Sequence, residues 1–248
     1  MSLLVIQTRG VGDDSRADAR NRTRQHELEN AMRKSKSETA ETRKRIVEAA
    51  AKAFRKQGIA ATGVAEIMAS AGLTHGGFYR HFSSKDQLVT EALAATEKNL
   101  LRDSREAAGQ GPKAMLEVCQ DYVTQAYRDN VEDGCPLAAM GSELVRADDA
   151  TRHAATSSFR RIVETMAPFM HAQDDTDGLD TALSLLTNMV GALTIARMVD
   201  DPVLSDRILA TARQRIAGSI DLSARVPAPP LDENALPATS RRSTSHRR

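Results

Sequence analysis

Apolar residues recur at intervals of three and four along most of the chain, the spacing that predicts amphipathic helices. Glycine, proline and short polar runs interrupt the pattern and mark the expected helix ends. We expect about nine helices and an all-α fold. The first covers residues 38–57, two short ones lie within 62–82, and a long one runs from about 84 to Gly109. The others cover about 112–130, 149–171, 178–199 and 202–220, and a further one begins at Pro136 and carries Leu137, Met140 and Leu144.

Residues 62–82 hold the most informative pattern, two short helices joined by a tight turn. Thr62 is the expected N-cap of the first helix. Gly72 stands where a left-handed glycine commonly ends a helix, and Thr74 is the expected N-cap of the second. The apolar stripe between the first cap and the glycine consists of Val64, Ile67, Met68 and Ala71. This arrangement predicts a helix-turn-helix, in which the second helix enters the DNA major groove.

Two adjacent glycines, Gly76 and Gly77, interrupt the second short helix. Each costs roughly 1 kcal/mol relative to alanine in a helix. We interpret them as positions where the backbone approaches another body closely, and a duplex groove is one candidate. The alternative is a poorly formed turn in an ordinary all-α protein. The agreement of cap, stripe, turn glycine and second cap favours the helix-turn-helix.

Three stretches of this region carry a family resemblance: Ala71-Gly72-Leu73-Thr74, Gly76-Gly77-Phe78-Tyr79-Arg80-His81-Phe82 and Ser84-Lys85. With residues 42–50, Phe54 and Gly58 upstream, they resemble the DNA-binding region of TetR-family transcriptional regulators. The resemblance implies an N-terminal helix-turn-helix domain followed by a helical domain that binds a ligand and dimerises. Gly63 and Gly77 depart from the family pattern, which often has hydroxyl-bearing residues there, so no hydroxyl contact is assigned to them.

The expected DNA-binding surface lies around the second short helix. The resemblance implies a phosphate contact for Tyr79. Lys85 stands at a helix N-terminus, where the backbone dipole and the ammonium group both attract an anion. His75 and Arg80 are the candidates for base edges, because arginine can form paired hydrogen bonds to guanine. The predicted DNA-binding residues are Thr62, Thr74, His75, Gly76, Gly77, Tyr79, Arg80, His81 and Lys85.

Composition narrows the class of protein without deciding it. The formal net charge is +1, so any positive surface for DNA must be local. Two distant cysteines make neither a disulfide scaffold nor a zinc site, and we expect a cytoplasmic protein with no metal and no cofactor. No uninterrupted apolar run approaches the roughly 18–20 residues of a membrane helix, so no membrane partner is expected.

Both ends of the chain lack helical periodicity. Residues 1–37 are polar and arginine-rich, and we expect a disordered basic arm. Met32 is an alternative start, which would make the preceding residues an over-extended start. Otherwise they form a real arm that adds nonspecific attraction to phosphates. Residues 223–248 are expected to be a disordered tail. The expected domains are then a DNA-binding domain over 38–84 and a regulatory and dimerisation domain over 85–222.

The segment 178–199 is apolar nearly all round, which predicts burial on more than one side. With 202–220 it would form a four-helix bundle across a two-fold dimer, and the family resemblance implies the same pair. The alternative is a central helix of a monomer. A two-fold dimer would bind a palindromic operator in double-stranded DNA. The predicted interface residues are Leu186, Met189, Val190, Leu193, Ile208 and Ile216.

A small-molecule effector site is expected inside the regulatory bundle. Methionine adapts to varied apolar ligands, and a buried tyrosine hydroxyl is a natural polar contact. Ordinary core packing is the alternative for each residue. The predicted lining residues are Met115, Cys119, Tyr122, Met140, Met166 and Met189.

Cys135 offers a different kind of sensor. It stands beside a helix N-terminus, which favours the thiolate, although Asp133 nearby opposes this. A Gly-Cys at this point resembles family members that sense electrophiles or oxidants; the alternative is a partly buried capping residue.

Taken together, the sequence predicts a dimeric repressor released from its operator by a small apolar ligand. Sensing through Cys135 is the alternative. An α-helical enzyme is a third possibility, but we find no metal motif, phosphate loop or nucleophile triad to support one.

Overall fold

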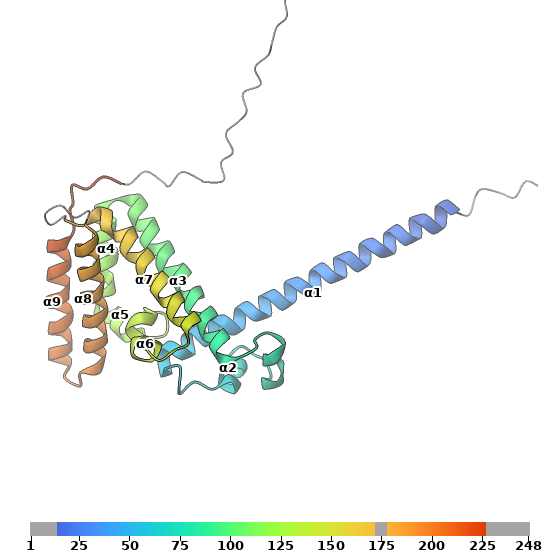
Figure 1. The fold of residues 1–248 in the computed structure, drawn as a ribbon, viewed down its shortest axis with the longest axis horizontal. Helices are drawn as coiled ribbons and strands as arrows, with labels where there is room; N and C mark the ends of the chain where they lie inside the picture. Colours follow the sequence, from blue (N-terminus) through green and yellow to red (C-terminus); the bar gives the residue numbers. More distant parts are fainter. Residues whose placement is uncertain (1–13, 172–177, 227–248) are drawn as a thin grey trace, which may run out of the picture. The chain divides into compact units, whose positions relative to one another are not determined.

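The computed structural model describes residues 14–171 and 178–226 (Figure 1). Over these residues the fold is all-α as predicted, with no strand beyond one isolated bridge between Met170 and Ile220. The helices are α1 (Asp14–Gln57), α2 (Val64–Ser70), η1 (His75–Arg80), α3 (Lys85–Gln110), α4 (Pro112–Tyr122), α5 (Gln125–Asp129), α6 (Pro136–Leu144), α7 (Asp149–Met166), η2 (Ala167–Phe169), α8 (Leu179–Met198) and α9 (Pro202–Ser219).

Helix α1 begins at Asp14, so residues 14–37 are helical where we expected a disordered arm. The segment contains neither glycine nor proline and is rich in Ala, Arg, Glu and Lys, which favour a helix. The prediction relied on the lack of an apolar stripe, which reports on burial and not on helix formation. Residues 1–13 and most of the predicted tail lie outside the described residues.

The helix expected over 112–130 is divided into α4 and α5. Val123 leaves the helical conformation, and Thr124 begins the next helix. The Thr124 hydroxyl accepts from the backbone N–H of Tyr127 at 3.2 Å and donates to the carbonyl of Asp121 at 2.8 Å. A threonine that bonds its own backbone in this way competes with a continuous helix.

The chain forms two compact units that differ from the expected domains. Unit 1 is Met1–Glu97 with Val131–Ala155, and unit 2 is Lys98–Asn130 with Thr156–Arg248. The first part of α3 and all of α6 therefore belong to the unit that holds α2 and η1. Apolar packing explains this, because Leu88 and Leu93 of α3 and Leu144 of α6 share one core with Phe54 of α1.

The core of unit 1 fixes the position of η1. Phe78 of η1 and Phe82 just after it are buried, with their rings stacked at 5.6 Å between centroids. They join Ile46 and Phe54 of α1 and Met68 of α2 in the same cluster. Burying a large apolar side chain stabilises a fold by roughly 1.5–3 kcal/mol, so these contacts are enough to hold a short 3-10 helix in place.

Unit 2 is built around α8 and α9, which lie side by side (Figure 1). Asp201 caps α9 by accepting from the N–H groups of Val203 and Leu204, and Pro202 takes the first helical position. Arg128 of α5 donates to Ser205 and Asp206 of α9, at 2.8 and 2.9 Å. These contacts attach α5 to the start of α9.

Helix α8 is the one described helix long and apolar enough, by length and composition, to cross a membrane. An 18-residue stretch of this 20-residue helix has a mean hydropathy of 1.4. A core helix of a globular protein passes the same test. Leu185, Met189 and Leu193 of α8 are buried, and Arg197 donates to the carbonyls of Tyr127 and Arg128. We therefore interpret α8 as the central helix of unit 2.

Candidate nucleic-acid interface

The turn between α2 and η1 has the predicted glycine in the left-handed conformation, with φ of +73° at Gly72. The N–H of Gly72 donates to the carbonyl of Ala69 at 2.9 Å, and the N–H of Leu73 donates to Met68 at 2.8 Å. This pair of bonds is the Schellman motif, which uses two of the carbonyls that a helix end leaves unpaired. Helix α2 therefore stops abruptly and the chain turns into η1 within four residues.

The second short helix is a 3-10 helix and not the α-helix that we expected. The N–H of Gly77 donates to the carbonyl of Thr74 at 3.0 Å, and that of His81 to Phe78 at 2.9 Å. Thr74 precedes η1 as predicted, but its side chain makes no capping bond. Two glycines disfavour the α-helix, and a tighter helix of this length is common in short connectors.

Within η1, Phe78 is buried, and the two residues that follow it are exposed. Phe78 is 1% exposed and anchors the helix, while Tyr79 is 73% exposed. The two rings meet edge to face, with 5.2 Å between centroids and 83° between planes. His75 and Arg80 are also exposed. The helix therefore presents a phenol, an imidazole and a guanidinium to solvent, while the buried ring of Phe78 anchors it to the core.

Neither backbone conformation nor close packing within the chain requires glycine at Gly76 or Gly77. Neither has a positive φ. A Cβ at Gly76 would meet nothing within 4 Å, and one at Gly77 would meet only the Met68 side chain, at 3.5 Å. Since the fold accepts a side chain at Gly76, the glycine there is compatible with close approach of an external surface.

The prediction that Thr62 belongs to the DNA-binding surface is wrong. Thr62 is 1% exposed, and its hydroxyl donates to the carbonyl of Gly58 at 2.6 Å. The N-cap of α2 is Gly63, which has no side chain to cap with. Thr62 therefore stabilises the chain before α2 and is not accessible to DNA.

Lys85 and His81 are half-buried, unlike the exposed residues of η1. The Lys85 ammonium donates to the carbonyl of Ile59 and lies 6.0 Å from the ring centroid of Phe54. Ser84 caps α3 by accepting from the N–H of Gln87 at 3.1 Å. Lys85 thus has a partner within unit 1, in addition to any phosphate contact.

Glu143 of α6 is a residue that the sequence analysis missed in this role. Its carboxylate accepts from the N–H groups of Ile59 and Ala60, at 2.9 and 2.8 Å. No sequence pattern connects a glutamate with a turn more than 80 residues earlier, so only the structure could reveal the contact.

The predicted effector residues are divided between the units. Met115, Cys119, Tyr122, Met166 and Met189 are all buried in unit 2, and burial raises the pKa of the Cys119 thiol to about 12. The prediction that Met140 lines the same site is wrong, because Met140 packs in the core of unit 1. The sequence showed an apolar helix containing Met140 but not which core it joins.

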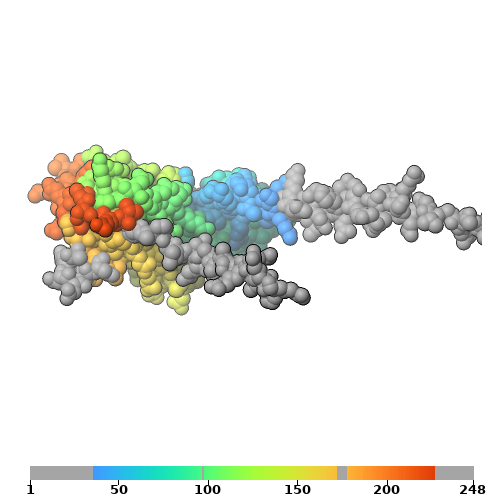
Figure 2. Space-filling model, turned by 90° about the horizontal axis from the view of Figure 1, so that it is seen from above, coloured from blue at the N-terminus to red at the C-terminus, as the bar shows by residue number. Residues whose placement is uncertain are grey.

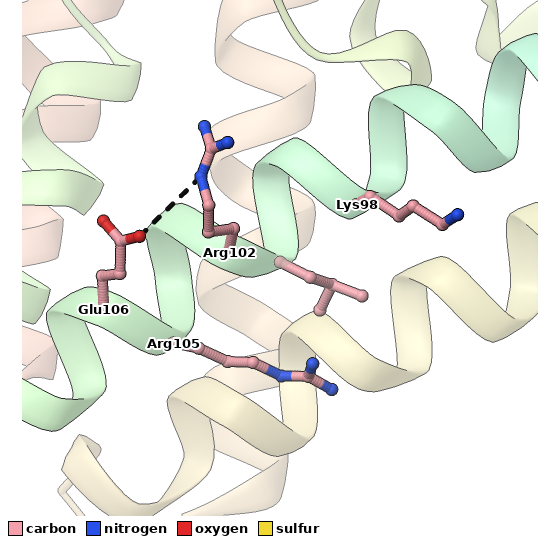
Figure 3. Close-up of a pocket in the computed structure, with 5 residues that line it drawn as sticks. Lys98, Arg102, Arg105 and Glu106 are labelled. Carbon is pink, nitrogen blue, oxygen red and sulfur yellow. Dashed lines mark ion pairs between the residues drawn. The ribbon is translucent and has the colours of Figure 1, made fainter. Parts of the chain in front are cut away.

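A separate hollow of about 390 Å³ lies along α3 in unit 2. Figure 3 shows four of its residues, Lys98, Arg102, Arg105 and Glu106, with an ion pair of 3.8 Å between Arg102 and Glu106. Leu101 completes the lining. The hollow is mostly basic, which differs from the methionine-rich effector site that we expected.

The predicted dimer residues also need correction. Leu186, Met189, Leu193 and Ile216 are buried within unit 2 itself and present no surface to a second copy. Val190 and Ile208 are half-buried. Because α8 is apolar nearly all round, its sequence did not reveal which stripe faces outward.

The outer face of α8 and α9 instead carries a shallow groove of about 710 Å³. The last described helix can be followed at the surface in Figure 2, in orange to red. The groove is lined by Ser184, Thr187, Asn188, Gly191, Ala192, Ile195, Leu204, Arg207, Ile208, Thr211, Ala212 and Arg215.

Cys135 precedes α6, with Pro136 in the first turn as expected. The thiol makes no capping hydrogen bond and the residue is 3% exposed. Burial of this kind restricts access of an electrophile, so the structure gives no particular support to a sensor role in this conformation.

A short helix, a Schellman turn and an exposed, anchored second helix define a helix-turn-helix, the arrangement that places its second helix in the DNA major groove. Residues 46–92 match the family model described as "Bacterial regulatory proteins, tetR family". This region of the chain is therefore similar to TetR-family transcriptional regulators.

Known proteins agree with this assignment. The chain is 38% identical over 110 residues to the probable HTH-type transcriptional regulator ArpR of Pseudomonas putida, covering 41% of this chain and 52% of that protein. It is 27% identical over 150 residues to the HTH-type transcriptional regulator AcrR of Shigella flexneri, covering 57% and 70%. The match therefore spans only about half the length of ArpR. These relatives are named as regulators and not as enzymes.

Among solved structures, the fold is similar to that of E. coli NemR in its reduced form, with a TM-score of 0.63. The two are 18% identical, and the match covers 75% of this chain and all of NemR. At that identity the similarity concerns the fold alone.

Proposed function

We propose that this chain is a DNA-binding transcriptional repressor that acts in the cytoplasm as a homodimer and is released from a palindromic operator by a small apolar effector. The exposed face of η1 carries the proposal. Tyr79 and Arg80 project from a helix whose neighbouring residue, Phe78, is buried in the core of unit 1. A surface held this firmly loses little conformational entropy when it binds.

The side chains of η1 suit two kinds of DNA contact. A tyrosine hydroxyl donates to a phosphate oxygen and fixes register, whereas arginine can read guanine through its O6 and N7 atoms. His75 is a second candidate for a base edge. Gly76 would let the backbone come within van der Waals distance of the duplex, where a side chain would keep it away.

The groove on α8 and α9 supports the homodimer. Its small and apolar residues, among them Gly191, Ala192 and Ile195, allow close approach of a second helix pair. Two copies related by a two-fold axis would form a four-helix bundle. The helix-turn-helix of each copy would then bind one of two half-sites about 34–36 Å apart, or a multiple of that spacing.

The buried methionines of unit 2 support an apolar effector. Met115, Met166 and Met189 lie in its core together with Cys119 and Tyr122. Methionine side chains can rearrange around ligands of varied shape. An effector that binds one conformation better than the operator-bound one must weaken operator binding, and the operator must weaken effector binding by the same factor.

The experiment is a search for a protected palindrome in DNA upstream of the gene, followed by a titration measured by fluorescence anisotropy. The test variant combines Tyr79→Phe with Arg80→Ala, and it should lose at least about thirtyfold in operator affinity if each contact contributes about 1–3 kcal/mol. The matched control is Arg160→Ala, which removes an exposed arginine of α7 in unit 2. Equal operator affinities for the double variant and the control would refute the assigned surface.

A further inference from the structure

The turn between α1 and α2 is held by two side chains from outside it, Lys85 and Glu143, and by Thr62 from within it. Gly58, just after α1, has φ of +89°. Lys85 of α3 donates to the carbonyl of Ile59, and the hydroxyl of Thr62 donates to the carbonyl of Gly58. Glu143 of α6 supplies the acceptor for the N–H groups of the same turn. The turn therefore has external partners for both its donors and its acceptors.

The Glu143 contact is a two-point contact. Oε2 accepts from the N–H of Ile59 at 2.9 Å, and Oε1 accepts from the N–H of Ala60 at 2.8 Å. Both oxygens of one carboxylate are used, so the side chain fixes the orientation of the peptide units as well as their position. Hydrogen bonds to a charged acceptor are roughly twice as strong as neutral ones.

Gly58 is what allows the carboxylate to come so close. A Cβ at Gly58 would lie 2.9 Å from Glu143 Oε2, closer than real Cβ contacts. The positive φ at Gly58 also disfavours any other residue there. Sterics and backbone conformation thus both require glycine opposite Glu143.

The other end of α6 is attached to α1 as well. Lys56 of α1 lies 2.6 Å from a Glu132 carboxylate oxygen, and Lys52 lies 3.2 Å from Asp133. Arg55 donates to the carbonyl of Glu132 at 2.6 Å. The segment that enters α6 is therefore bound to the last turns of α1, and Glu143 near the end of α6 is bound to the turn that follows α1.

We propose that Glu143 is a positioning residue for DNA binding, which sets from α6 the placement of the turn that leads into α2 and η1. Helix α2 begins at Val64, four residues after Ala60, and the backbone-bonded turn at Gly72 carries that placement on to η1. A shift of α6 would then move the DNA-binding face as a whole. The proposal rests on the proposed function, because it concerns the same surface.

The test variant is Glu143→Gln, measured in the full-length protein. The amide oxygen can accept from one N–H, but the amide NH₂ opposes the other, so the two-point contact is lost. Operator affinity should fall about tenfold, the size expected for one charged hydrogen bond. Glu48→Gln is the matched control, since it removes an exposed carboxylate of the same unit whose ion pair with Lys44 lies within α1 and does not involve α6.

Two readouts separate positioning from a structural role or a direct contact. The slope of log affinity against log salt concentration should stay unchanged, because no phosphate contact is removed. Affinity for nonspecific DNA should also stay unchanged at a temperature where circular dichroism shows both proteins fully folded. A loss of operator and nonspecific binding in equal measure would indicate mere unfolding and overturn the proposal.

Hydrogen exchange of the wild-type protein provides a test that does not depend on the variant folding. The amides of Ile59 and Ala60 should be protected, and Glu143→Asp, which keeps the charge on a shorter side chain, should exchange them faster. Rapid exchange at both amides in the wild type would overturn the proposal. If the wild type binds an operator and Glu143→Gln binds it equally well, the proposal fails while the proposed function stands. If the wild type binds no operator, the proposed function itself fails.

Discussion

The guanidinium of Arg43 lies over the ring of Phe82, with 4.1 Å between its central carbon and the ring centroid. The same group donates to the carbonyl of His81 and pairs with Glu91 of α3. Arg43 therefore joins α1, the end of η1 and α3 at one point. The partners of its positive charge therefore lie within the protein. The sequence of α1 does not distinguish Arg43 from the other basic residues of that helix.

Replacement of Arg43 tests this role. Arg43→Ala should lower the free energy of unfolding by about 1–2 kcal/mol, through loss of a cation–π contact and a charged hydrogen bond at a half-buried site. Arg45→Ala, which removes an exposed neighbour on α1, should change it by less than about 0.5 kcal/mol. Urea denaturation followed by circular dichroism measures both. Equal effects of the two substitutions would show that the Arg43 contacts do not stabilise unit 1.

Gly76→Ala should separate DNA binding from stability. The structure has room for the added methyl group, so thermal stability should be unchanged or slightly higher. Operator affinity should fall at least tenfold if the backbone at Gly76 meets the duplex. Gly218→Ala, at an exposed and equally open position of α9, is the control and should leave affinity unchanged. Undiminished operator binding by Gly76→Ala would show that the duplex does not come close at this residue.

The dimer surface is tested at Ile195, which is 41% exposed and lines the groove on α8 and α9. Ile195→Lys adds a charge to a groove that already holds Arg207 and Arg215, so two copies should repel each other there. We expect sedimentation to show monomers at micromolar concentration and operator affinity to fall. Met198→Lys changes a 70% exposed residue of the same helix outside the groove and should stay dimeric. A dimeric Ile195→Lys protein would place the interface elsewhere.

The cysteines should be inert in the folded protein. Burial raises the pKa of Cys119 to about 12, so the neutral thiol persists at pH 8.5, where the reactive thiolate would be needed. The unfolded thiol ionises near pH 8.5, so the folded state holds the extra proton between that pH and about 12, and stability should fall as pH rises through this range.

Iodoacetamide treatment followed by mass spectrometry should show labelling of Cys119 and Cys135 only after urea unfolding. Labelling of Cys135 in the native protein would instead favour the sensor alternative. In that case Cys135→Ser should retain operator binding and lose the response to electrophiles.

Elements defined by local chemistry were predictable from the sequence. Gly72 ends α2, Ser84 caps α3 and Pro202 begins α9, and each depends on residues within a few positions of itself. The all-α class followed from periodicity in the same way. Three of the predicted DNA-binding residues, His75, Tyr79 and Arg80, are exposed on η1.

Features that depend on distant contacts were not predictable. Thr62 stands before an apolar stripe, which predicts a cap, yet its hydroxyl donates to the carbonyl of Gly58. Met140 joined a core that its own helix did not reveal. The outward stripe of α8 was misplaced because the helix has apolar residues on every side, so its periodicity left the choice open.

The turn at Gly72 is supported by backbone hydrogen bonds and one left-handed glycine, and no side chain at 75, 79 or 80 contributes to it. Those three positions are exposed, and the ring of Tyr79 contacts Phe78 edge to face. Base preference can therefore change by substitution there while the scaffold keeps its stability. A designer seeking a new target sequence can randomise these positions and expect most variants to fold.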